Sequence, residues 1–206
     1  MDWIDVNNLG VSHFGIHPGL LPLSNIRFDT FHMKCSITRK LMTLLRAFIL
    51  NQSTLIIGKF SALLSKFWSD FLLFVWRNNK GFTSFNGNEL KAFVDHMPEI
   101  VKFMEDTFVV SDETVNIIDG LKLWKMIWKF ISISKVEPRE REQYVLDMAT
   151  NENNLKMFYE VGAKSFLTGG SSIGGEETFY MHALRFYIPM ITKITFDRHG
   201  IGIGIF

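Results

Sequence analysis

Asp29 has the most informative surroundings of any acidic residue in this chain. It follows the segment 25–28, which is predicted to be a short strand, and it precedes a helical pattern of apolar residues. A carboxylate at a strand end is well placed to hold Mg²⁺ or Mn²⁺, because the strand fixes its oxygens and the sheet edge leaves room for water and substrate. Alternatively, Asp29 is the N-cap of the following helix, and the residue pattern alone favours this cap.

Four further side chains are candidates for a site. His32 follows Asp29 by three residues, a spacing that suits a ligand pair or an acid–base pair on one helix face, although a packed histidine is the commoner outcome. Arg185, Lys193 and Arg198 could form a stripe that contacts DNA phosphates. A solvated helix face is the alternative for these three residues, and it is favoured.

The glycine-rich segment 168–175 does not match a nucleotide-binding loop. Gly169 and Gly174 have the spacing of a P-loop, but Gly175 and Glu176 stand where that motif requires Lys and Ser or Thr. The single cysteine, Cys35, excludes a disulfide framework and any zinc site built from several thiolates.

Composition argues against a general attraction to polyanions. The 206 residues carry 22 basic and 21 acidic side chains, so binding to nucleic acid would need a local basic patch. The most apolar region, residues 41–76, is interrupted by charged residues, and the N-terminus lacks the pattern of a signal peptide. We therefore expect an intracellular protein without a membrane partner.

The positions of apolar residues predict a mainly α fold with a helical bundle-like middle. Helical spacing recurs over residues 37–48, 56–75, 90–104, 117–131 and 180–191, and the tryptophans within these runs are expected in the core. Ser111 is a predicted helix N-cap and Gly200 a predicted helix stop. Short β segments are expected near residues 25–29 and 201–206.

Two stretches of the chain, residues 12–41 and residues 177–206, are similar to a known family. The first contains Asp29-Thr30-Phe31-His32, and the second contains His182 followed by Tyr187-Ile188-Pro189. Together they resemble transposon-derived proteins of animal genomes that have a DDE, RNase H-like transposase core.

The resemblance implies a domain plan and a chemistry. Residues 1–50 would form a strand–helix unit carrying Asp29, residues 51–168 the helical insertion, and residues 176–206 a terminal helix and strand, together a single domain or a domain fragment. Asp29 would match the second metal-binding carboxylate, His32 the histidine beside it, and Mg²⁺ or Mn²⁺ would drive cleavage and transfer of a DNA strand. The protein would then be nuclear.

The same resemblance is incomplete at its catalytic centre. A two-metal site needs several converging carboxylates, and neither the first nor the third acid of the family has a counterpart in this sequence. We therefore expect a fragment, a decayed copy or a domesticated remnant that is inactive alone, and the resemblance is the sole ground for expecting Mg²⁺ or Mn²⁺. The alternative function is a non-enzymatic helical protein-interaction module, with self-association through apolar helices as a further expectation.

Overall fold

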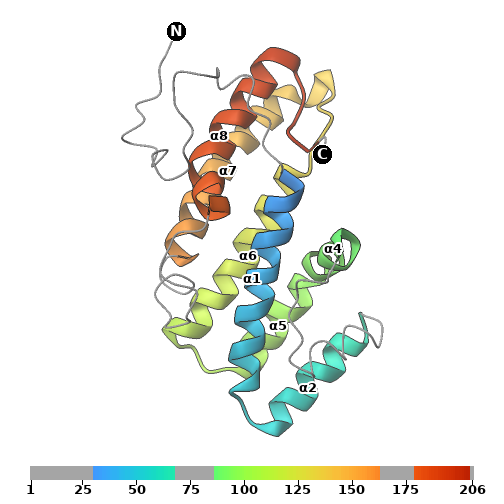
Figure 1. Cartoon of the computed structure of the whole chain (residues 1–206), viewed down its shortest axis with the longest axis vertical. Coiled ribbons are helices and arrows are strands. Elements are labelled where there is room, and N and C mark those ends of the chain that lie inside the picture. Colours follow the sequence, from blue (N-terminus) through green and yellow to red (C-terminus); the bar gives the residue numbers. More distant parts are fainter. Residues whose placement is uncertain (1–29, 68–85, 163–178, 205–206) are drawn as a thin grey trace.

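The computed structural model describes residues 30–67, 86–162 and 179–204, and within these ranges the protein is mainly helical (Figure 1). The helices are α1 (Thr30–Leu50), α2 (Thr54–Ser65), α4 (Gly87–Asp95), α5 (Met97–Thr107), α6 (Asp112–Ile131), α7 (Arg141–Gly162) and α8 (Phe179–His199). A short 3₁₀ turn, η5 (Pro138–Glu140), leads into α7. The predicted segments 25–29 and 168–175 lie outside the described residues.

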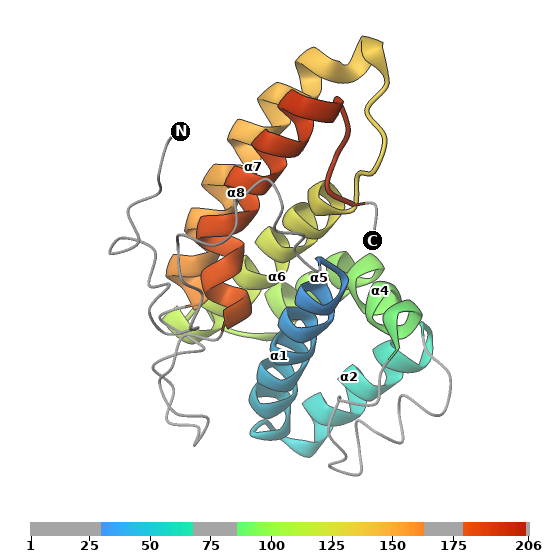
Figure 2. The ribbon, with the colours of Figure 1, turned by 45° about the horizontal axis from the view of Figure 1, so that its top comes forward.

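Helix α6 lies at the centre of the structure and packs against α1 on one side and α7 on another. Aromatic pairs fix the second contact, since Trp124 stacks on Phe158 with ring centroids 5.4 Å apart and Phe130 stacks on Tyr144 at 5.2 Å. The order of these pairs shows that α6 and α7 run antiparallel. Helix α8 then returns along α7, as both views show (Figures 1 and 2).

A second group of helices, α2, α4 and α5, covers the other side of α1 and α6 (Figure 2). Phe60 of α2 packs on Phe103 of α5 with ring centroids 5.2 Å apart, and Phe48 of α1 packs on Phe108 at 4.9 Å. The buried apolar side chains of both groups belong to one continuous core. The region expected as a helical bundle is therefore a packed bundle centred on α1 and α6.

Several predicted helix boundaries are confirmed. Ser111 caps α6, and its Oγ accepts a hydrogen bond from the Thr114 amide at 3.2 Å. Gly200 has a φ of 66° directly after α8, a conformation that favours glycine at a helix end. Pro98 lies in the first turn of α5, where a missing amide hydrogen costs nothing. Helix α8 continues through Pro189.

The C-terminal segment 201–204, expected as part of a strand, forms no strand but pairs with the backbone that follows α6. The amides of Gly202 and Gly204 donate to the carbonyl oxygens of Ser134 and Ile133 at 3.2 and 2.8 Å. A Cβ at Gly202 would overlap the Ile133 carbonyl oxygen, so a side chain cannot fit. Glycine is therefore required for this close approach.

No helix within the described residues is long and apolar enough to cross a membrane.

Candidate anion-binding cleft

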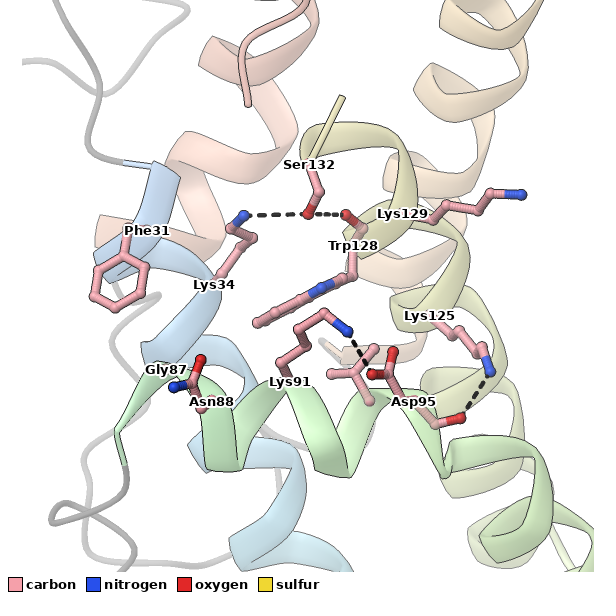
Figure 3. Close-up of a pocket in the computed structure, with 11 residues that line it drawn as sticks. Phe31, Lys34, Gly87, Asn88, Lys91, Asp95, Lys125, Trp128, Lys129 and Ser132 are labelled. Atoms are coloured by element: carbon pink, nitrogen blue, oxygen red, sulfur yellow. Dashed lines mark hydrogen bonds and ion pairs between the residues drawn. The ribbon is translucent and has the colours of Figure 1, made fainter. Parts of the chain in front are cut away.

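A cleft of about 480 Å³ opens where α1, α4 and α6 meet (Figure 3). Helix α1 contributes Phe31 and Lys34, helix α4 contributes residues along its whole length, among them Lys91 and Asp95, and the C-terminal half of α6 contributes most of the remaining wall. The full lining is Phe31, Lys34, Gly87, Asn88, Lys91, Val94, Asp95, Lys125, Trp128, Lys129 and Ser132. Four lysines thus surround one carboxylate, in a chain whose net charge is only +1.

Lys34 lies deepest among the charged groups of the cleft. The residue is only 8% exposed, its Nζ donates to Ser132 Oγ at 3.1 Å, and the same amine lies 5.1 Å from the centre of the Trp128 ring. Ser132 Oγ in turn donates to the Trp128 carbonyl oxygen at 2.7 Å. Burial lowers the pKa of Lys34 from its ordinary value, and the neighbouring Cys35 only partly opposes this effect.

The cleft's carboxylate leaves much of the positive charge uncompensated. Asp95 accepts a hydrogen bond from Lys91 Nζ at 2.5 Å, and the backbone carbonyl of Asp95 accepts from Lys125 Nζ at 3.0 Å. Only the first of these contacts neutralises a charge, because a carbonyl carries none. The cleft therefore holds an excess of three formal positive charges, with Lys129 extending outward in Figure 3.

Aromatic side chains form two walls of the same cleft. Trp128 is half-buried, while Phe31 is 44% exposed and lies on the opposite side (Figure 3). A Cβ at Gly87 would lie 2.7 Å from the Phe31 ring, so the missing side chain lets this ring lie against the first turn of α4. That turn is held by a capping box, in which the Asn86 side chain and Glu89 satisfy each other's backbone amides.

None of the predicted site residues within the described ranges lines the cleft. Asp29 lies outside the described residues, and no group of three or more potential metal ligands occurs in the part of the chain that is described. His32 is exposed on α1, with its ring edge-on to Phe31 at 5.6 Å. It is therefore next to a cleft residue but is not part of the cleft lining.

The three basic residues of α8 do not form one stripe. Arg185 packs over the rings of Tyr159 and Phe186 at 4.4 and 5.2 Å, and Lys193 pairs with Asp197 at 2.9 Å. At about 100° per residue, Arg198 lies roughly 140° around the helix from Lys193. Their role in contacting DNA stays a prediction, and the structure brings none of them to the cleft.

The position of Lys34 in the sequence, rather than its residue type, indicates that it is buried. Lys34 precedes Leu41 and Leu45 by seven and eleven residues, so it falls on the buried stripe of α1 rather than on the charged face. Trp128 was expected in the core with Trp124, and only Trp124 is fully buried. No residue spacing in the sequence predicts that Lys91 of α4 and Lys125 of α6 line the same cleft.

Comparisons with models of protein families, with well-characterised proteins and with solved structures found no match to this chain.

Proposed function

We propose that this protein is a non-enzymatic helical binding module whose cleft between α1, α4 and α6 binds an anionic ligand. The observation that carries the proposal is the position of Lys34, an amine in an almost fully buried residue, in a cleft lined by three further lysines. Burying a cationic group is unfavourable unless a counter-charge is present, and no carboxylate pairs with Lys34 among the described residues. A bound anion would supply that counter-charge.

The groups lining the cleft suit binding better than catalysis. Its one carboxylate, Asp95, is held by Lys91, and its hydroxyl, Ser132, is engaged as donor and acceptor. Lysines on packed helices provide charge at fixed positions, which is what recognition of a carboxylate, sulfate or phosphate requires.

Inorganic tripolyphosphate is a suitable probe for this proposal. Titrated calorimetrically at low salt, it should bind the wild-type protein and bind at least tenfold more weakly to the triple variant Lys91→Gln/Lys125→Gln/Lys129→Gln. The matched control, Lys59→Gln/Lys66→Gln/Lys156→Gln, removes three charges from exposed positions that do not line the cleft. Equal losses in both variants would contradict a specific site.

A second proposal is carried by the sequence alone. We propose that the chain derives from a DDE transposase, with the RNase H-like core, the short β segment near residues 25–29, the DNA partner and the nuclear location that this origin implies. Its support is the pattern Asp29-Thr30-Phe31-His32 together with the stretch 177–206. Calorimetric titration of Mn²⁺ into the wild type and Asp29→Ala tests it: binding lost in the variant would support a metal site at Asp29, and no binding in either would oppose it.

Self-association remains a proposal as well. Its support is exposed apolar side chains, of which Leu55, Val109 and Val110 are 66%, 89% and 83% accessible. Light scattering over a wide concentration range tests it, and a constant monomeric mass would contradict it.

A further inference from the structure

The proposed anion site also has two aromatic walls, and these narrow the class of ligand. We propose that the cleft takes a small ligand in which a planar aromatic ring carries a phosphate or carboxylate group, with the ring against Trp128 and the anion at the lysines. This inference rests on the proposed function and goes beyond it, because a bare anion would have no use for the aromatic walls.

The first argument is the shape of the cleft. Its volume of about 480 Å³ lies within the range of about 300–1,000 Å³ typical of small-molecule sites. Phe31, Trp128 and Val94 give it apolar surfaces, while the charged amines lie at its depth and along its rim (Figure 3). An amphipathic ligand fits this division, because a ring would cover the aromatic surfaces while an anionic group faced the amines.

The second argument is the unequal environment of the indole. Lys34 Nζ lies over the Trp128 ring at 5.1 Å, and Trp124 contacts the same ring edge-on at 6.1 Å. These contacts hold the indole in place, yet Trp128 remains half-buried because nothing in the described chain covers the rest of it. A fixed and partly open indole next to amines is suited to stacking with a ring whose substituent is negative.

The third argument is that Phe31 lies where it can form the opposite wall. It is a large aromatic side chain, 44% exposed, at the edge of the cleft, and Gly87 provides the space that its ring occupies. Exposing a phenyl ring to water is unfavourable unless something covers it. A ligand ring between Phe31 and Trp128 would cover both.

Three probes separate the contributions of ring and anion. Adenosine monophosphate carries both groups, ribose 5-phosphate carries the anion alone, and adenosine carries the ring alone. We expect adenosine monophosphate to bind the wild-type protein about 5- to 150-fold more tightly than ribose 5-phosphate in calorimetric titrations, because stacking on an aromatic side chain contributes that much. Benzoate beside phenyl phosphate, which share the ring and differ in the anion, then distinguishes a carboxylate ligand from a phosphate ligand.

Two variants locate the effect. In Trp128→Leu the preference for adenosine monophosphate over ribose 5-phosphate should fall to about onefold, while ribose 5-phosphate keeps its wild-type affinity. In Met126→Ala, which shortens an exposed side chain of α6 that does not line the cleft, the preference should be unchanged. Circular dichroism confirms that each variant is folded before titration.

The outcomes distinguish this inference from the proposed function. Equal binding of ribose 5-phosphate and adenosine monophosphate would overturn the aromatic inference and leave an anion site in place. Equal binding of adenosine and adenosine monophosphate would overturn the anionic function itself, as would binding by none of the probes, tripolyphosphate included. A preference that survives in Trp128→Leu would also overturn the inference, since the ring would then bind elsewhere.

Discussion

Trp124 and Trp128 lie one turn apart on α6 and face α1, yet their surroundings differ completely. Trp124 is fully buried, its Nε1 donates to Thr38 Oγ1 at 2.9 Å, and its ring stacks on Phe158. Trp128 is half-buried and has Lys34 over its ring. Thr38 and Lys34 are themselves one turn apart on α1, so α1 contributes a threonine to the layer of side chains around Trp124 and a lysine to the layer around Trp128.

The comparison shows how one residue changes a packed layer into a site. A threonine hydroxyl can use both its donor and its acceptor inside a core. Thr38 Oγ1 donates to the Lys34 carbonyl oxygen at 2.8 Å and accepts from Trp124. The Lys34 ammonium donates to the neutral Ser132 hydroxyl, but that hydroxyl does not balance its positive charge, which needs water or an anion. The layer that contains Lys34 therefore remains open as a cleft.

Truncating the two tryptophans should give the largest difference between the layers. Trp124→Ala should destabilise the protein by about 3–5 kcal/mol, because it leaves a large cavity in the core. Trp128→Ala should cost less than half as much, since its ring is already partly solvated. Urea denaturation of both variants measures the difference, and equal losses would contradict the distinction between a closed and an open layer.

Removing the Thr38 hydroxyl, which belongs to the closed layer around Trp124, should have the next largest effect on the free energy of unfolding. Thr38→Val keeps the shape of the side chain but leaves the buried indole N–H of Trp124 without its acceptor, at a cost of about 1–3 kcal/mol. Thr43→Val is the matched control, because Thr43 Oγ1 donates to the Arg39 carbonyl oxygen on the exposed side of the same helix. Similar free energies of unfolding for both variants would contradict a stabilising role for the Thr38–Trp124 bond.

Tyr144 extends the comparison to a buried aromatic residue whose polar group is not satisfied by the described chain. Its hydroxyl has no hydrogen bond among the described residues, and burial, helped by Asp147, raises its pKa from 10.0 to about 12. Between these two values the unfolded chain is ionised and the folded protein is not, so unfolding releases a proton and rising pH favours it. Wild-type stability should therefore fall by up to about 1.4 kcal/mol per pH unit more than that of Tyr144→Phe over this window.

Urea denaturation at several pH values from 9 to 12 measures this effect. The comparison with Tyr144→Phe cancels the titration of all other groups. Parallel pH profiles for the two proteins would show that Tyr144 ionises equally in both states.

The smallest effect on stability is expected at Lys34. Its lowered pKa means that burial of the charged amine costs stability at neutral pH, and the cost disappears as pH rises through the folded pKa towards the ordinary value of 10.5. Lys34→Met removes the charge and keeps an unbranched side chain, so the midpoint of thermal unfolding at pH 7 should stay level or rise. A fall of several degrees would instead mark Lys34 as a stabilising residue.

Much of the fold could be predicted from sequence because it depends on local patterns. Apolar spacing predicts α1 and α6, the Ser111 hydroxyl predicts the start of α6, and Gly200 predicts the end of α8. Each of these signals acts over one or two helical turns, where the physical cause and the residue lie close together in the chain.

The cleft could not be predicted in the same way. It depends on helix packing that brings Lys34 within hydrogen-bonding distance of Ser132, 98 residues later. The sequence did show Lys34 in register with Leu41 and Leu45, which predicts burial but not the partner. A charged residue within a buried stripe is therefore the sequence feature that would have indicated the site.

Calorimetric titration of adenosine monophosphate into wild-type protein and Lys34→Met, at low salt and pH 7, tests the central claim most directly. A folded Lys34→Met protein of undiminished stability whose affinity is about tenfold or more below that of the wild type is the predicted result, because a charge-assisted hydrogen bond to the ligand is lost. Equal affinities in the two proteins would contradict the claim that the buried amine makes this cleft an anion-binding site.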